Sequence, residues 1–261
     1  MPNWLANALL ILPAGLLIAI CFKRDLIEIG WKVMAVQAAI MLPVAAYLGL
    51  VWAPPEREMG DVYRIIYAHV PQVWMALLGV TLNFGCSLAY LMKKSWTADA
   101  LAEASAEVGL YFGIVGVTLG AIWGKPTWGV YWTWDPRLTS AAVMLIYYTG
   151  YLAMRRFTEN PDTRATWSAA LGTFGIVIPV TVYFSVVWMK SLHQVQSTPK
   201  TVDPQMVFAL RWAACAFLCL LITFTYQRYK VARAALAREV APPEALSGPP
   251  PSSNDVAKVA V

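Results

Sequence analysis

The chain of 261 residues is 59% hydrophobic, and Asp, Glu, Lys and Arg occupy only 13% of its positions. Soluble domains hold about 25% charged residues, so an ordinary soluble protein is excluded. The net charge of +5 is divided among separate clusters that form no basic stripe suited to nucleic acid, and a nucleic-acid-binding function is therefore not expected.

Seven apolar segments follow one another along the chain, most of them close to the roughly 20 residues that cross a bilayer as a helix. They cover residues 5–22, 33–53, 66–92, 108–123, 139–154, 169–189 and 206–226. Each can satisfy its own backbone hydrogen bonds as a helix, which lipid requires. The sequence therefore predicts an all-α integral membrane protein with a bundle of six core transmembrane helices in residues 30–230 and an extra N-terminal helix in residues 1–24.

The two ends of the chain are predicted to lie outside this bundle. A signal peptide carries positive charge before its apolar core, whereas Lys23 and Arg24 follow the first segment and no Lys or Arg comes earlier. The segment is thus predicted to be a retained helix with its N-terminus outside. Residues 239–261 contain several prolines and serines and little apolar mass, which predicts a disordered cytoplasmic tail.

Basic residues cluster in every second connection between the apolar segments. The clusters are Lys23, Arg24 and Lys32; Lys93 and Lys94; Arg155, Arg156 and Arg164; and Arg228, Lys230, Arg233 and Arg238. The positive-inside rule places these connections in the cytoplasm. The other connections, near residues 54–65, 124–138 and 190–205, then face the periplasm if the membrane is a bacterial inner membrane.

One periplasmic connection, within residues 121–140, is unusually rich in tryptophan. It holds four of the chain's twelve tryptophans, namely Trp123, Trp128, Trp132 and Trp134. One or two would be an ordinary interfacial belt, because indole has an apolar ring and a polar N–H. Four of them, with Gly124 and Gly129 to allow tight backbone turns, predict a platform for a flat apolar ligand.

Charged residues at the edges of this platform are candidates for holding a polar part of the ligand. Lys125 and Arg137 can pair with ligand carboxylates, and Asp135 can accept hydrogen bonds from the loop backbone or from indole N–H groups. Arg64 and Arg211 lie near periplasmic helix ends. Each can either reach a ligand carboxylate or extend to the lipid headgroups.

The chain contains two histidines, His69 and His193. A lone histidine in an apolar segment most often has a packing role. However, the alternation of basic connections puts both histidines on the same membrane face as the tryptophan-rich connection. Two imidazoles on different helices can ligate one iron from both sides, so the residues predict a heme site at this face.

The remaining polar and sulfur-containing residues indicate no further chemistry. The cysteines form neither a thiol-exchange motif nor a covalent heme motif, and packing explains them: Cys21, Cys86, Cys215 and Cys219. Glu103 and Glu107 are interpreted as charges placed at a helix N-terminus. Phosphate-binding loops, dinucleotide fingerprints and zinc-protease motifs are missing from the sequence.

The stretch from Trp123 to Ser140, W-G-K-P-T-W-G-V-Y-W-T-W-D-P-R-L-T-S, strongly resembles the WWD domain of heme-handling proteins. Its R-L-T-S ending, with R-I-I-Y-A-H-V-P at residues 64–71 and S-L-H-Q at residues 191–194, is similar to the CcmC branch, over about residues 30–230. The larger relatives CcmF and CcsA use four functional histidines. This chain has only two, so the resemblance is to the CcmC branch and not to these relatives. The family usually has six spans, so segment 5–22 departs from its pattern.

The resemblance implies that His69 and His193 are axial ligands of non-covalently bound heme b and that the WWD segment holds the heme edge. It implies a non-enzymatic protein that presents heme to the membrane-anchored chaperone CcmE for cytochrome c maturation. The implied partners are CcmA and CcmB, which form an ABC-type complex, and the small protein CcmD.

Two alternatives stay open on the sequence alone. One is a b-type electron-transfer subunit, which also uses two histidines. Such a subunit usually keeps its heme ligands at membrane depth, whereas both histidines here lie at predicted helix ends. The other is a permease for a different substrate, although no broken-helix site at the midplane supports it.

Overall fold

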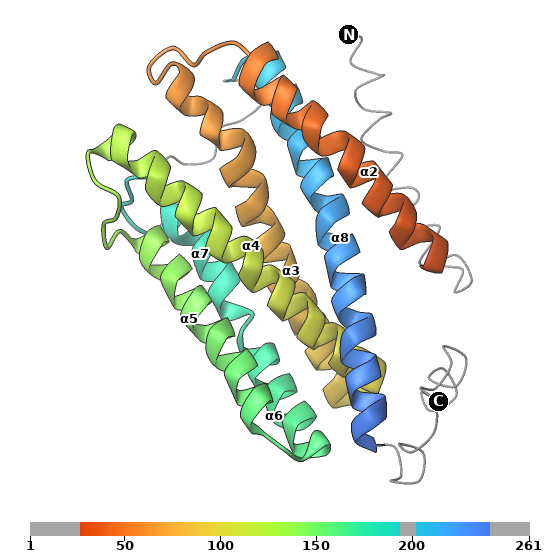
Figure 1. The fold of residues 1–261 in the computed structure, drawn as a ribbon. Helices are drawn as coiled ribbons and strands as arrows, with labels where there is room; N and C mark the ends of the chain where they lie inside the picture. Colours follow the sequence, from red (N-terminus) through yellow and green to blue (C-terminus); the bar gives the residue numbers. More distant parts are fainter. Residues whose placement is uncertain (1–26, 194–201, 241–261) are drawn as a thin grey trace.

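The computed structural model describes residues 27–193 and 202–240, and the regular elements in this part of the chain are helices (Figure 1). They are α2 (Ile27–Tyr47) with a π-helical turn η2 (Leu48–Trp52), a 3-10 helix η3 (Asp61–Ile65), α3 (Ile66–Lys93), α4 (Trp96–Trp128), α5 (Pro136–Phe157), α6 (Pro161–Phe174), α7 (Val177–Trp188) and α8 (Pro204–Val240). The segment predicted in residues 1–24 and nearly all of the predicted tail lie outside the described residues.

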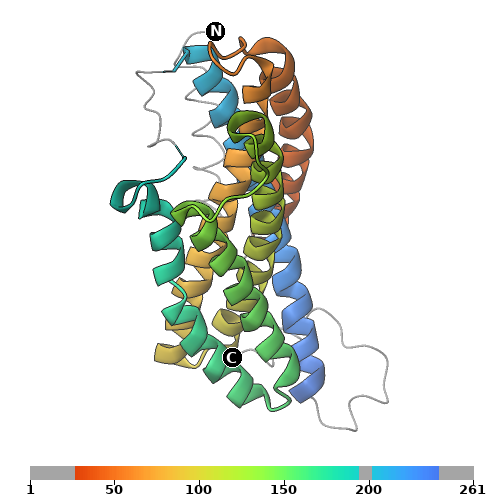
Figure 2. The same ribbon diagram turned by 90° about the vertical axis from the view of Figure 1, so that its left-hand side faces the viewer.

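The helices run side by side in an elongated bundle (Figures 1 and 2). Five stretches are long and apolar enough to cross a membrane: Glu28–Trp52, Asp61–Lys93, Trp96–Trp128, Pro161–Trp188 and Pro204–Glu239. α5 is less apolar, but its 22 residues extend about 33 Å, enough for a hydrocarbon core of about 30 Å. The prediction of an all-α, multi-pass membrane protein is confirmed.

The span from Pro161 to Trp188 is broken between α6 and α7. Proline has no backbone N–H, so Pro179 cannot donate to the carbonyl of Gly175, where a regular helix would place that bond. α6 accordingly ends at Phe174, and the Gly175 carbonyl accepts the Ile178 N–H at 3.1 Å instead. The predicted single segment 169–189 is therefore two helices.

Two other helices extend well beyond the apolar segments that predicted them. α4 begins at Trp96, where the Ser95 hydroxyl accepts the Ala98 N–H, and not at residue 108. α8 continues to Val240 instead of ending near residue 226. An apolar segment marks only the part of a helix in lipid, and charged turns outside lipid continue the helix when other helices satisfy their charges.

Glycines allow α3 and α4 to approach closely. A Cβ atom added to Gly79 of α3 would lie 2.7 Å from the Cα atom of Gly109 of α4. Further along the same face of α4, at helical spacing, come Gly113, Gly116 and Gly120. Small residues at such spacing let helix backbones pack closely within a membrane.

Ion pairs join the helices at the end of the bundle where α4 begins and α5 ends, here called the ion-pair end (bottom of Figure 1). The buried Arg155 guanidinium donates to both carboxylate oxygens of Asp99 at 2.7 and 2.9 Å and to Glu103 at 2.7 Å. Two further pairs, Arg164 with Glu239 and Arg228 with Glu107, tie α6 and α4 to α8.

These pairs correct the interpretation of Glu103 and Glu107 as helix N-terminal charges. Both carboxylates lie inside α4 and bind arginines of other helices. Three arginines counted among the loop cations, Arg155, Arg164 and Arg228, are likewise engaged within the bundle. The positive-inside rule counts Lys and Arg regardless of nearby carboxylates, so the predicted orientation does not change.

Candidate functional site

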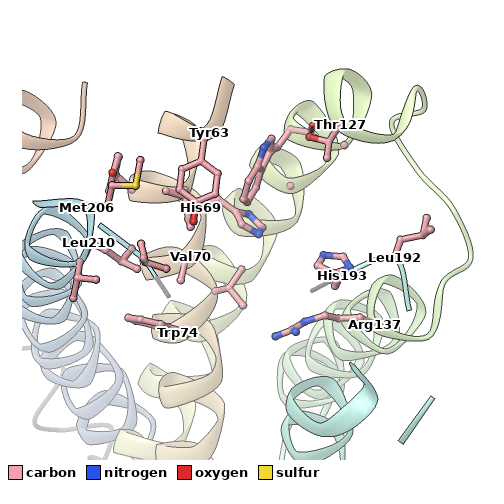
Figure 3. Close-up of a pocket in the computed structure, with 18 of the residues that line it drawn as sticks. Tyr63, His69, Val70, Trp74, Thr127, Arg137, Leu192, His193, Met206 and Leu210 are labelled. Atoms are coloured by element: carbon pink, nitrogen blue, oxygen red, sulfur yellow. Dashed lines mark hydrogen bonds between the residues drawn. The ribbon is translucent and has the colours of Figure 1, made fainter. Parts of the chain in front are cut away.

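A cavity of about 370 Å³ lies at the end of the bundle opposite the ion-pair end, here called the cavity end (Figure 3). Its walls come from the start of α3, the end of α4, the start of α5, the residues after α7 and the start of α8. Ligand pockets usually measure about 300–1,000 Å³ and combine apolar walls with a few polar groups. Here the charged or titratable groups are His69, His193, Arg137 and Arg211, together with Tyr63 and Tyr67.

His69 lies in the first turn of α3 and is held against α4. Its Nδ1 atom is 2.8 Å from the carbonyl oxygen of Gly116, and a carbonyl can only accept, so Nδ1 carries the proton. Nε2 is then the lone-pair nitrogen of the ring. A Cβ atom on Gly120 would lie 2.8 Å from the His69 Cε1 atom, so the absence of a side chain there makes room for the ring.

His193 reaches the cavity from the irregular segment that follows α7. Its Nδ1 atom is buried, has no hydrogen-bond partner within the described chain and lies 3.7 Å from the Asp135 carboxylate. Burial lowers the pKa of His193 to about 4, and the nearby Arg137 acts in the same direction. The ring is therefore neutral at pH 7, the form that ligates a metal. Figure 3 shows His69 and His193 on opposite walls of the cavity.

Two of the predicted tryptophans pack against the histidines. Trp123 contacts the His69 ring edge-on with ring centroids 5.7 Å apart, and Trp128 contacts the His193 ring with centroids 4.9 Å apart. Both tryptophans lie on the last turns of α4, because that helix continues through Pro126. The tryptophan-rich segment is thus not one loop, since only residues 129–135 are irregular.

The glycines of this segment act differently from each other. Gly129 has a φ of +78° and ends α4, as the turn prediction requires. Gly124 is helical and buried, and a Cβ atom there would lie 3.2 Å from the carbonyl oxygen of Val130. The prediction that Gly124 forms a turn was wrong. Its role is to let the chain after Gly129 fold back against α4.

The other predicted platform residues do not line the cavity. Trp132 and Trp134 pack edge-on with ring centroids 5.7 Å apart, and the Trp134 side chain is 78% exposed. Lys125 donates to the carbonyl of Gly129 at 2.9 Å and lies over the Tyr131 ring, so it caps the end of α4. The structure therefore separates an inner pair of tryptophans from an outer pair, of which Trp134 is exposed and Trp132 is half-buried.

Asp135 connects two parts of the site. Its Oδ1 atom accepts the backbone N–H groups of Arg137 and Leu138 at the start of α5, and its Oδ2 atom accepts the Leu192 N–H at 2.8 Å. Burial alone would raise the pKa of Asp135, but hydrogen bonds from Ser191 and these backbone amides lower it. The carboxylate is therefore charged at neutral pH, in keeping with the predicted backbone hydrogen bonds.

The three arginine candidates have different surroundings. Arg137 points its guanidinium into the cavity (Figure 3), and Arg211 lines the cavity from α8. Neither has an ion-pair partner within residues 27–193 and 202–240. Arg64 instead donates to the carbonyls of Gly49 and Ala53 and pairs with Asp61, so neither role considered for it from the sequence describes its contacts.

Several residues that line the cavity were not predicted from the sequence. They are mostly apolar or aromatic: Tyr63, Tyr67, Trp74, Met206 and Leu210. Nothing in the sequence distinguishes them from other residues of apolar helices. The glycine spacing along α4 was, in contrast, a usable signal. It marks the face that receives α3 and, at Gly116 and Gly120, the position of His69.

Comparison with known proteins shows that the chain is similar to the members of one family. The model of one family, CcmC, described as heme exporter protein C, matches residues 21–243. Heme exporter protein C of Escherichia coli K12 is 33% identical over 209 residues, which are 77% of this chain and 83% of that protein. The Paracoccus denitrificans protein of this name is 34% identical over 205 residues, 73% of this chain and 85% of the relative. That of Rhodobacter capsulatus is 35% identical over 167 residues, 62% and 67% of the two chains.

Proposed function

Because the chain belongs to the CcmC family of heme exporter proteins, with a role in heme handling for cytochrome c maturation, we propose that its cavity holds heme between His69 and His193. The bound molecule is cargo, non-covalently held heme b that is presented to a chaperone of the CcmE type. The protein supplies position and electrostatics and performs no catalysis of its own.

The placement of the two imidazoles is the observation that carries this proposal. They lie on opposite walls of one cavity, and the Gly116 carbonyl fixes the His69 tautomer that leaves Nε2 free. Within the described residues, no group of three or more His, Cys, Asp or Glu side chains is placed to hold a metal ion. Two imidazoles alone suit an iron whose remaining ligands come from a porphyrin.

The charges in the cavity support a ligand with carboxylates. An unpaired, partly buried guanidinium such as that of Arg137 is costly unless an anion joins it, and the exposed Arg211 lines the same cavity. Heme propionates are suitable anions. In this arrangement Trp123 and Trp128 contact the macrocycle beside the histidines, whereas the exposed Trp134 and the half-buried Trp132 form a surface that a chaperone can contact.

The positions of the histidines favour presentation over electron transfer within the membrane. His69 lies in the first turn of α3 and His193 lies beyond the end of α7, so both are at the cavity end of the bundle. We propose that this end faces the periplasm across a bacterial inner membrane, because the basic clusters of the described residues, among them Lys93, Lys94 and Arg156, lie at the opposite end. The proposed partners are the CcmA–CcmB complex and CcmD.

The absorption spectrum of the purified protein tests the heme site. We expect wild-type protein to carry heme with a six-coordinate, low-spin spectrum. His69→Ala or His193→Ala opens one axial position, so the low-spin bands are lost or the heme content falls. Added imidazole refills the open position and partly restores the spectrum. Single variants that keep the wild-type spectrum without imidazole would show that other groups hold the iron.

A reporter enzyme tests the orientation independently of heme. A reporter inserted near Thr127 is expected to be active as a periplasmic fusion, and one placed after Lys94 as a cytoplasmic fusion. The reverse pattern would put the cavity on the cytoplasmic side and contradict periplasmic presentation.

A further inference from the structure

Resting on the proposed function, we infer that Asp135 is the positioning residue of His193: one carboxylate oxygen caps α5 while the other holds the segment that carries the histidine. This inference rests on the different hydrogen-bond partners of the two carboxylate oxygens. Oδ1 accepts from Arg137 N–H at 2.9 Å and Leu138 N–H at 3.2 Å, whereas Oδ2 accepts from Leu192 N–H at 2.8 Å.

The two histidines differ in how their backbones are held. His69 belongs to a helix, and its ring is fixed by the Gly116 carbonyl. His193 belongs to no helix, since α7 ends at Trp188, and its segment needs another anchor. The Leu192 N–H bond to Asp135 joins positions 57 residues apart and ties this segment to the start of α5. Within the segment, the His193 N–H also bonds to the Ser191 hydroxyl at 3.1 Å.

The same carboxylate faces the His193 ring. The distance from Asp135 Oδ1 to His193 Nδ1 is 3.7 Å, and this buried nitrogen has no hydrogen-bond partner within the described chain. Histidines that ligate metals almost always donate their second ring N–H to a carboxylate, a carbonyl or water. Such bonds are often long without ligand and shorten in the complex. Asp135 is thus placed to keep the proton on Nδ1 and leave Nε2 for the iron.

The arrangement makes the two axial ligands unequal. A neutral carbonyl supports His69, whereas a buried carboxylate supports His193. A carboxylate partner makes an imidazole a stronger donor to the metal, which stabilises the ferric state. The loss of the Asp135 charge should therefore raise the reduction potential of the bound heme, and loss of the equivalent interaction at His69 should have the smaller effect.

Two substitutions separate the roles of Asp135. Asp135→Asn keeps one oxygen to cap α5 and to face His193 Nδ1, but it removes the negative charge and puts an amide NH₂, which cannot accept the Leu192 N–H, in place of Oδ2. Asp135→Ala loses the cap as well. Asn160→Ala is the matched control, because Asn160 caps α6 by accepting the Thr163 N–H at 2.9 Å and lies at the ion-pair end.

The experiment measures heme retention, absorption spectrum, reduction potential and thermal unfolding of the full chain in detergent. For Asp135→Asn we expect near-wild-type unfolding, heme retention lower by about 10–100-fold, a more positive potential and recovery of the low-spin bands with imidazole. Asp135→Ala should add a loss of thermal stability like that of Asn160→Ala, which itself should keep wild-type heme properties.

The outcomes distinguish this inference from the proposed function. If His193→Ala loses low-spin heme but Asp135→Asn retains the wild-type spectrum and potential, the positioning role is wrong and the heme site stands. If Asn160→Ala impairs heme retention as strongly as Asp135→Ala, the effect is one of helix capping alone, which also overturns the inference. If wild-type protein and its histidine variants do not differ, the proposed function itself fails.

Discussion

At the ion-pair end of the bundle Arg155 is buried against two carboxylates and the Ser168 hydroxyl, whereas at the cavity end Arg137 and Arg211 face a cavity with no ion-pair partner in the described residues. A buried charge that is satisfied inside the protein serves the fold. A cation that faces a cavity without a partner does not stabilise the fold. It indicates a binding site for an anion that comes from outside the protein. Pairing within the chain, more than burial, separates the structural end of this protein from its binding end.

Removal of a partner of Arg155 should have the largest effect on stability. Asp99→Ala leaves a buried guanidinium with Glu103 as its one carboxylate, and breaking a buried pair costs about 3–5 kcal/mol. We expect the free energy of unfolding in detergent to fall by about 3 kcal/mol. Glu239→Gln at the exposed pair with Arg164 is the control and should cost less than about 1 kcal/mol. Equal losses in both variants would contradict the distinction.

A methyl group at Gly120 should disturb the heme site at the cavity end, but it should lower the free energy of unfolding less than Asp99→Ala does. The new Cβ atom would lie 2.8 Å from the His69 ring, which cannot move away without losing its bond to Gly116. Heme retention in Gly120→Ala should fall about 10–100-fold, as for a misplaced metal ligand. Gly85→Ala in α3 is the control, since nothing lies within 4 Å of its added atom. Equal heme content in the two variants would show that this contact does not position His69.

Among the cations at the cavity end, only those that line the cavity should affect heme. Arg137→Gln removes a charge-assisted hydrogen bond, worth about 1.5–3 kcal/mol when well formed, so we expect about tenfold weaker retention. Lys125→Gln should leave heme content unchanged, because Lys125 caps α4. A titration of apoprotein with heme measures both. Equal weakening would place Lys125 at the ligand and remove the distinction between the two residues.

The smallest effect on heme retention is expected at the exposed Trp134. Trp134→Ala should retain normal heme content because the side chain is 78% exposed and does not line the cavity. Transfer to a purified CcmE-type chaperone should nevertheless slow, since the docking surface changes. Trp128→Ala, which removes the ring beside His193, is the comparison and should reduce heme content itself. A loss of heme in Trp134→Ala alone would reverse these assignments.

The sequence predicted the parts of the site that depend on composition and on alternation along the chain. Two histidines, a tryptophan-rich segment and basic clusters in every second connection placed His69 and His193 at one end of the bundle, and the structure puts both in the wall of one cavity. The six core segments were predicted because lipid requires long apolar helices.

The parts that were missed depend on long-range contacts. Nothing near Asp135 in the sequence indicates that its second oxygen binds Leu192, and nothing near Arg155 indicates burial against Asp99. The continuation of α4 through Pro126 was missed because proline and glycine usually end helices, although both are tolerated near the end of this one. These features depend on which helices pack together, and local propensity does not determine that.

The most direct test of the heme site replaces both histidines together. The His69→Ala, His193→Ala double variant, purified and titrated with heme beside wild-type protein, should show no six-coordinate low-spin species, because the two axial nitrogens of the cavity are gone. Its thermal unfolding without heme should stay close to that of the wild type, since neither ring takes part in the ion-pair end. A double variant that still forms the wild-type low-spin spectrum would contradict the assignment of His69 and His193 as the ligands.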